Sequence, residues 1–125
     1  IMAPWNYPVQ LLLLPAVDAI AAGNRVALKP SEAVPGIAAL LAALLPAALG
    51  EDVVRVVTGG SEIAAEFAAQ PWDHLVFTGG TATGVKVMRA AAEHLVPVTL
   101  ELGGKCPVVV LPGADLAQAV RAILA

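Results

Sequence analysis

The sequence predicts an α/β fold with an open parallel sheet and helices on both of its faces. Short apolar runs rich in β-branched residues alternate along the chain with longer segments rich in alanine and leucine. The short runs lack a regular alternation of apolar and polar residues, which is typical of strands that are covered on both faces. Right-handed crossovers between such parallel strands place helices on both sides of the sheet.

The strands and helices can be assigned in order. "IMA" at the start of the chain is interpreted as the end of a first strand, and further strands are expected at 25–29, 53–57, 74–78, 97–101 and 107–111. Helices are expected near 8–22, 34–49, 61–69, 82–94 and 114–125. Thr81 or Thr83, and Asp115, are the expected N-caps of the last two helices. Residues 102–106 are too few for a helix, so the last two strands need another kind of connection.

Composition narrows the classes of protein that the chain can belong to. With 125 residues it is one domain at most, and 58% of its residues are hydrophobic while 14% are charged. Much apolar surface must therefore be covered by the chain or by a partner. The apolar runs are too short for a membrane span. A net charge of −3 without a basic cluster argues against nucleic acid.

The cysteine and histidine residues give little information about the function of the chain. The single cysteine, Cys106, excludes an internal disulfide framework and fits a reducing compartment such as the cytoplasm. No signal peptide is visible in "IMAPWNYP", and no Cys/His spacing suggests a metal site.

Polar residues follow the predicted strands at the point where each strand ends. In an open α/β sheet, ligands bind beyond the carboxyl ends of the strands, so these residues are expected to share one rim. They are Asn6; Lys29, Ser31 and Glu32; Thr58, Gly59 and Gly60; the "GGTATG" run at 79–84; and "ELGGK" at 101–105.

The "FTGGTATG" run at 77–84 connects a strand to a helix. Gly79 and Gly80 allow close approach of the backbone to a ligand, and the helix N-terminus favours a phosphate. The run is not a dinucleotide fingerprint, because Thr81 stands where the middle glycine should be. It is not a P-loop either, because Val85 replaces the lysine and Lys86 lacks a following Ser or Thr. The alternative is an ordinary glycine-rich turn.

Lys29 and Glu32 flank "PS" at the end of a predicted strand. This pair can hydrogen-bond to the hydroxyls of an adenosine ribose. The alternative is a solvated helix start, with Ser31 as the cap and Glu32 in the first turn.

Three further residues are candidates for chemistry. Glu101 closes an apolar strand, where partial burial would raise its pKa and suit a general base; the alternative is a pair with Lys105. The amide of Asn6 can donate to a developing oxyanion or brace its turn. Cys106 is expected to be a small buried thiol at the entry of the 107–111 strand.

Four motifs in this order, "PWNYP", "AAGNRVALKPSE", "FTGGTATG" and "LELGGK", together resemble the NAD(P)-dependent aldehyde dehydrogenase superfamily. "PVTLELGGK" with "GGTATG" is most similar to the branch of coniferyl aldehyde dehydrogenases and class 3-like enzymes. The resemblance implies a Rossmann-like cofactor domain, NAD or NADP as cofactor, an aldehyde substrate, and a homodimeric or homotetrameric parent enzyme. Glu32 favours NAD, because a carboxylate disfavours a 2′-phosphate.

The resemblance also implies roles for individual residues. Asn6 matches the oxyanion-hole asparagine, and Glu101 matches the base that activates water. The residues implied in cofactor binding are Lys29, Ser31, Glu32, Gly79, Gly80, Thr81, Gly84, Leu102 and Gly103. Gly80 and Cys106 each stand where the family often has serine.

The family's nucleophilic cysteine comes from a later segment. Residues 1–125 are therefore expected to be a partial NAD(P)-binding domain, without the nucleophile and the oligomerisation segments and inactive alone. Two alternatives stay open: a stand-alone, non-catalytic nucleotide-binding module, and a scaffold that uses its apolar excess for assembly.

Overall fold

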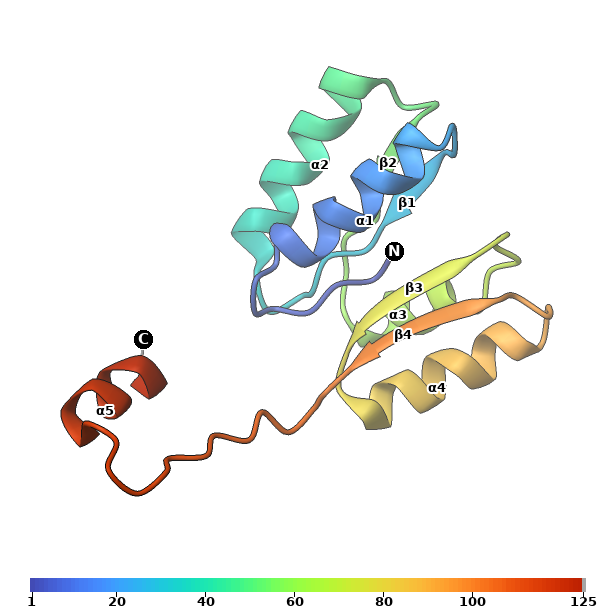
Figure 1. The fold of residues 1–125 in the computed structure, drawn as a ribbon. Helices are drawn as coiled ribbons and strands as arrows, with labels where there is room; N and C mark the ends of the chain where they lie inside the picture. The colour runs from blue at the N-terminus through green and yellow to red at the C-terminus, as the bar shows by residue number, and fades with distance from the viewer. Residues whose placement is uncertain (125) are drawn as a thin grey trace.

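Helices and strands alternate along the chain in the computed structural model, which describes residues 1–124. In chain order the elements are α1 (Gln10–Ala21), β1 (Val26–Leu28), α2 (Pro35–Leu49), β2 (Val54–Val56), α3 (Ser61–Ala68), β3 (Leu75–Gly79), α4 (Thr81–Ala92), β4 (Val98–Leu102) and α5 (Leu116–Leu124) (Figure 1). The helices predicted from the sequence are all found, although Ala125 lies outside the described residues. The strands predicted at 25–29, 53–57, 74–78 and 97–101 are also found.

Met2 joins two pairs of strands into one parallel arrangement. β1 pairs with β2, and β3 pairs with β4, both in parallel. Met2 forms parallel bridges to Lys29 on one side and to Phe77 on the other, so "IMA" is the end of a strand, as predicted. The resulting spatial order is β2, β1, Met2, β3, β4. Along the chain, β1 and β2 are added on one side of Met2, and β3 and β4 are then added on its other side. This is the strand order of a doubly wound fold.

A separate apolar core lies on each face of the sheet. Successive residues of a strand point to opposite faces, and accordingly Met2 belongs to one core while Ala3 belongs to the other. The core around Met2 includes Phe67 and Ala68 of α3 and Val87 and Ala91 of α4. The core around Ala3 includes Leu12 and Ala16 of α1 and Leu41 of α2. Helices therefore cover both faces, which confirms the predicted fold class.

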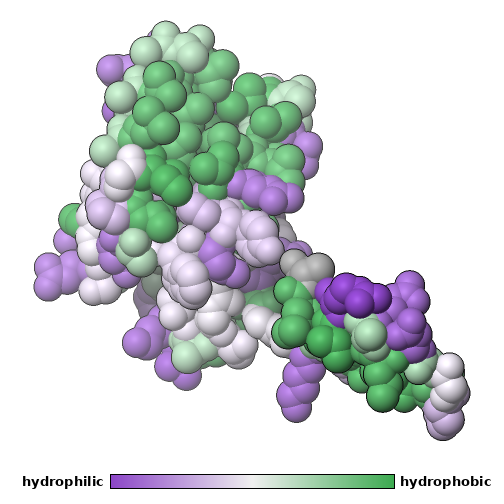
Figure 2. All heavy atoms as spheres, turned by 90° about the vertical axis from the view of Figure 1, so that its left-hand side faces the viewer, coloured by the Kyte–Doolittle hydropathy of each residue, from purple (hydrophilic) through white to green (hydrophobic). Residues whose placement is uncertain are grey.

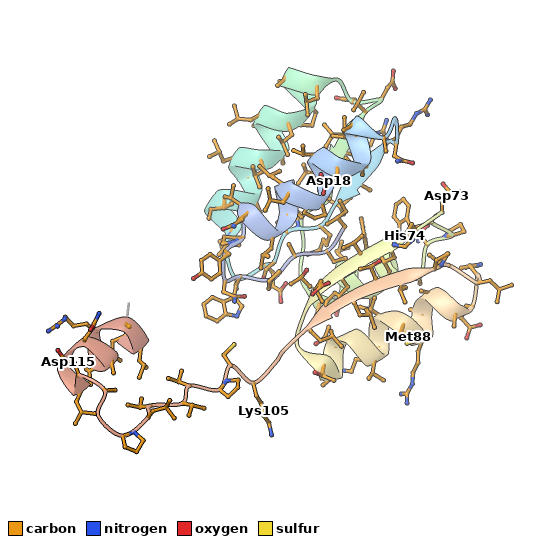
Figure 3. The ribbon with its side chains drawn as sticks, viewed as in Figure 1. Asp18, Asp73, His74, Met88, Lys105 and Asp115 are labelled. Atoms are coloured by element: carbon orange, nitrogen blue, oxygen red, sulfur yellow. The ribbon has the colours of Figure 1, made fainter. Side chains whose placement is uncertain are left out.

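The segment after β4 does not form the strand predicted at 107–111. It runs away from the sheet as an exposed arm, defined here as residues 103–124, that ends in α5 (Figure 1). β4 is an edge strand whose only described neighbour is β3, so residues 107–111 have no strand to pair with in the described part of the chain. Lys105 and Asp115 project from this arm (Figure 3). Asp115 caps α5 as predicted, since its Oδ1 accepts a hydrogen bond of 3.1 Å from the backbone N–H of Gln118.

Apolar side chains remain exposed on the body and on the arm. Figure 2 shows them gathered over the half of the molecule that holds α1 and α2, where Leu14, Val17, Leu40 and Leu44 are all more than half exposed. On the arm, Val109 is 79% exposed and no residue of α5 is buried. The apolar composition therefore leaves uncovered surface, as expected. Within residues 1–124 no helix combines the length and the apolar character that a bilayer crossing requires.

Candidate functional site

The strands present their carboxyl ends at one edge of the sheet. Met2 lies between Lys29 and Phe77, and Phe77 pairs in turn with Leu100, so these residues form one row across the strands. Asn6 and Glu101 follow this row along their own segments by a few residues. The structure therefore places Lys29, Gly79 and Glu101 at the carboxyl ends of adjacent strands, on the same side of the sheet.

A cleft of about 480 Å³ lies at this edge, on the face covered by α3 and α4. The two helices line the cleft with small side chains, which leave room between them. These are Ala64, Ala65 and Ala68 on α3 and Ala90 on α4. The predicted site residues that line the cleft are Lys29, Ser31, Glu32, Gly79 and Gly80. The cleft adjoins the point where the strand order reverses, which is where doubly wound folds bind their ligands.

Lys29 is the one charged residue buried in the core among the described residues. Its side chain is 2% exposed, and its Nζ donates a hydrogen bond of 2.9 Å to the carbonyl oxygen of Pro30. Desolvation lowers the pKa of Lys29, and the nearby Glu32 carboxylate acts in the opposite direction. Burial at the end of β1 thus fixes an amine at the wall of the cleft.

Ser31 and Glu32 lie in the turn between β1 and α2. The Ser31 Oγ accepts a hydrogen bond of 3.2 Å from the backbone N–H of Ala33, whereas α2 begins only at Pro35 with Val34 as its N-cap. Ser31 therefore closes a turn ahead of the helix and does not cap it. Glu32 is exposed and lines the cleft.

The glycine-rich turn connects β3 to α4. Gly80 is the N-cap of α4, and its carbonyl oxygen accepts hydrogen bonds from the N–H groups of Thr83 and Gly84 at 3.0 and 2.9 Å. The prediction that Thr81 or Thr83 is the N-cap is wrong, because Thr81 is already the first helical residue. No side chain caps this helix, so its first N–H groups stay free for a ligand at the cleft.

At two glycines in this region a Cβ would meet a neighbouring side chain at less than 3 Å, so that side chain would have to shift. A Cβ on Gly79 would lie 2.6 Å from the Cζ of Phe77, and a Cβ on Gly84 would lie 2.7 Å from Leu102 Cδ2. Gly84 therefore lets α4 approach β4 and supports the cleft from behind, without lining it. Leu102 acts with Gly84 in this packing.

Asn6 and Glu101 are both exposed at the same edge, outside the cleft lining. Asn6 precedes Tyr7, whose φ of 52° is in the left-handed region and whose carbonyl accepts a hydrogen bond of 3.0 Å from Leu11. The expectation that Glu101 is partly buried is wrong for the described residues. β4 is an edge strand and the arm leaves it directly, so nothing covers the Glu101 side chain.

Gly103 and Cys106 lie at the start of the arm and are exposed. The expectation of a buried thiol at Cys106 is therefore wrong, for the same reason as the missing strand after it. Residues 1–124 hold no group of three or more His, Cys, Asp and Glu side chains placed to bind a metal ion.

The sequence predicts a contribution from the start of α4 but not from the residues that follow along this helix. Thr83 and Lys86 line it together with Ala90, and all three lie on one face of the helix. The spacing of these residues by three and four positions is the signal that places them there. In the sequence, Lys86 stands out only because it does not fit the P-loop pattern.

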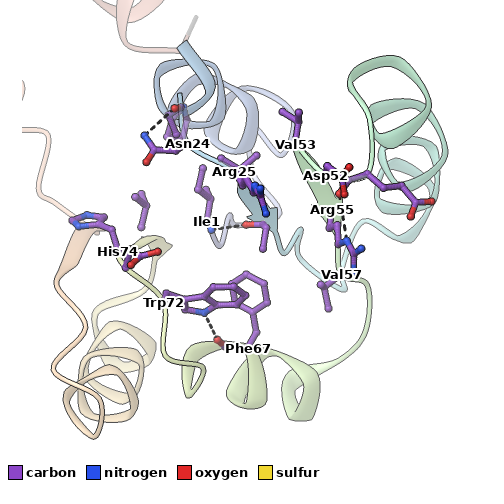
Figure 4. A pocket seen from close by; sticks show the side chains of 17 residues that line it. Ile1, Asn24, Arg25, Asp52, Val53, Arg55, Val57, Phe67, Trp72 and His74 are labelled. Carbon is purple, nitrogen blue, oxygen red and sulfur yellow. Dashed lines mark hydrogen bonds between the residues drawn. The ribbon is translucent and has the colours of Figure 1, made fainter. Parts of the chain in front are cut away.

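A second cavity, of about 640 Å³, lies at the opposite edge of the sheet, at the amino ends of the strands (Figure 4). Trp72 lines it and donates a hydrogen bond of 2.7 Å to the Phe67 carbonyl oxygen. Arg25, Asp52 and His74 also contribute to its wall. None of the predicted site residues lies here, so this cavity is separate from the rim.

The strand order, the helices on both faces and the cleft at the reversal point define a doubly wound, Rossmann-like α/β domain. The chain matches the Aldehyde dehydrogenase family over residues 1–125, and it belongs to that family.

The chain is 51% identical over 124 residues to a coniferyl aldehyde dehydrogenase of Pseudomonas sp. (strain HR199 / DSM 7063), covering 99% of the chain and 26% of that protein. It is 50% identical over 123 residues to the rat aldehyde dehydrogenase family 3 member A2, covering 98% of the chain and 25% of the relative. A mouse "Aldehyde dehydrogenase, dimeric NADP-preferring" is 48% identical, with 98% of the chain and 27% of the relative covered.

Among solved structures, the substrate-bound state of Staphylococcus aureus AldH is similar with a TM-score of 0.88 and 43% identity. The match covers 93% of the chain and 25% of that structure. The chain thus spans about a quarter of the length of its relatives. The placement by sequence, in the branch of the coniferyl and class 3-like enzymes, is confirmed.

Proposed function

We propose that the chain is the cofactor-binding part of an enzyme that oxidises an aldehyde to a carboxylic acid with NAD or NADP. The observation that carries the proposal is that Lys29, Gly79 and Glu101 lie at the carboxyl ends of adjacent parallel strands, while Asn6 follows the bridging residue Met2 by four positions in the chain. These residues come from separate segments, and of the four only Lys29 and Gly79 line the cleft itself.

The residues of the cleft fit a dinucleotide. Lys29 and Glu32 offer a donor and an acceptor to the hydroxyls of the adenosine ribose. Gly79 and Gly80 expose backbone to the pyrophosphate, and the uncapped N-terminus of α4 favours its negative charge. When bound, the cofactor supplies the acceptor for a hydride.

Asn6 and Glu101 serve the reacting group. The amide of Asn6 donates a hydrogen bond to the oxyanion that forms when a thiol adds to the aldehyde carbonyl. The carboxylate of Glu101 takes a proton from the water that hydrolyses the thioester. Both side chains are exposed at the rim, where a substrate delivered from outside the chain can reach them.

The nucleophile is assigned to a part of the enzyme outside these residues. Cys106 is an exposed residue of the arm, and the arm leads away from the cleft (Figure 1). The exposed valines and α5 of the arm are assigned to packing against the same outside part of the enzyme. The enzyme is proposed to be a homodimer or homotetramer, and to work in the cytoplasm.

The test compares the 125-residue chain with the full-length protein that contains it, each given NAD and an aromatic aldehyde such as coniferyl aldehyde. The full-length protein is expected to form the reduced cofactor continuously, whereas the 125-residue chain binds NAD without turnover. Sustained turnover by the chain alone would show that the nucleophile lies within it. A full-length protein that binds neither NAD nor NADP would refute the proposal.

A further inference from the structure

The ring of Phe77 packs against the glycine-rich turn between β3 and α4. Phe77 and Gly79 are two residues apart on β3, so their side-chain positions face the same side of the sheet. The three atoms nearest to the place of a Cβ at Gly79 are Cζ, Cε1 and Cε2 of Phe77, at 2.6, 3.1 and 3.3 Å. The outer end of the ring therefore occupies the space that a side chain at position 79 would take, and both residues line the cleft.

The rest of the Phe77 side chain is held by the core. Phe77 is 6% exposed and belongs to the core on the face covered by α3 and α4. Its backbone lies between Met2 and Leu100, in the middle of the sheet. In the described part of the chain, nothing lies within 4 Å of a Cβ at Gly80, and no side chain caps α4. The contact with the Phe77 ring therefore ties the turn to the core.

We infer that Phe77 is a positioning residue for a bound pyrophosphate, because its ring fixes where the backbone of Gly79 and Gly80 and the first N–H groups of α4 meet the phosphates. The inference rests on the proposed function, since it assumes that the pyrophosphate of a dinucleotide lies at this turn. A hydrogen bond from an N–H group to a phosphate weakens steeply when its distance or angle departs from the best geometry. With a shorter side chain at position 77 the turn would move toward the core, and these bonds would lengthen.

The experiment measures the binding of NAD and of NADP to the full-length protein by calorimetry, at a temperature at which every variant is folded. Phe77→Leu removes Cζ, Cε1 and Cε2, the three atoms that contact the turn. It is expected to weaken the binding of both cofactors by the same factor, roughly tenfold, which corresponds to the loss of one hydrogen bond to a charged group. With an aldehyde present, the KM for the cofactor should rise by a similar factor while kcat stays within about twofold, because the pyrophosphate does not change in the reaction.

The double variant Phe77→Leu/Gly79→Ala tests the contact itself. The added Cβ enters the space that the removed ring atoms leave, so the double variant should recover most of the affinity that Phe77→Leu loses. Leu75→Val is the matched control, since Leu75 is 1% exposed and belongs to the same strand and the same core, but lies outside the cleft lining. It should lower the free energy of unfolding and leave cofactor binding unchanged.

If Phe77→Leu weakens cofactor binding no more than Leu75→Val does, or if the double variant recovers none of the lost affinity, the inference is wrong while the proposed function stands. If the unmodified protein binds neither NAD nor NADP, both are wrong.

Discussion

Gly79 lies directly against the ring of Phe77, so close that a side chain at position 79 would require the ring to shift. A Cβ there would come within 2.6 Å of Phe77 Cζ, so the ring, which is 6% exposed and belongs to the core, would have to shift. This contact joins the core beneath the sheet to the turn that borders the cleft.

Gly79→Ala is therefore expected to destabilise the domain by about 1–3 kcal/mol, as overpacking does in other cores. The measurement is the free energy of unfolding in urea. The neighbouring Gly80→Ser is the control, because nothing lies within 4 Å of a Cβ at Gly80 and serine is a good N-cap for α4. Equal stability of both variants would contradict the packing described for Phe77.

Lys29 makes stability depend on pH. Burial lowers its pKa below the usual 10.5, so between the lowered pKa and 10.5 the unfolded chain holds a proton that the folded chain has lost. The free energy of unfolding contributed by this residue therefore rises with pH through that window. Urea unfolding of the parent and Lys29→Met at about pH 7 and about pH 10 should show the parent gaining relative to the variant at the higher pH. A difference that stays constant would mean that Lys29 titrates normally.

Asn6 and Glu101 are expected to affect chemistry without affecting stability, because both are exposed. In the full-length enzyme, Asn6→Ala should lower kcat by roughly 10²–10³-fold, which is typical for the loss of one oxyanion donor. Glu101→Gln should release reduced cofactor in one rapid burst and then slow down, because the thioester forms and is not hydrolysed. Stopped-flow absorbance measures both effects. Wild-type kinetics in either variant would remove that residue from the proposed roles.

The arm should be the most labile part of the isolated chain. Residues 103–115 are exposed and α5 buries no side chain, so local opening costs little there. Limited proteolysis of the 125-residue chain is expected to cut first within this segment and to leave a resistant body ending near Leu102. In the full-length protein the same bonds should be protected. Protection in the isolated chain would show that the arm packs on the body.

The sequence predicted the elements of the body well because each signal there is local. Apolar runs bounded by glycine and by caps mark Leu75–Gly79 and its neighbours without knowledge of the tertiary structure. The same local signal predicted a strand at 107–111, and that prediction is wrong for the described residues. A strand also needs a neighbouring strand to pair with, and residues 107–111 have none in the described part of the chain. Glu101 and Cys106 were expected to be covered, and they are exposed for the same reason.

The site was only partly visible in the sequence. Lys29, Glu32 and Gly79 follow strands, so the rule that ligands bind at carboxyl ends is enough to find them. Lys86 contributes to the cleft through helix α4, and which face of a helix borders a cavity depends on how the helix packs. The buried amine of Lys29 could not be foreseen either, because lysine is rarely buried at a strand end.

The position of the bound nucleotide tests the central claim most directly. A crystal structure of the full-length protein with NAD should place the adenosine ribose beside Lys29 and Glu32, and the pyrophosphate at the N-terminus of α4. Density for the nucleotide in the cavity at the amino ends of the strands, beside Arg25 and Trp72, would contradict the account.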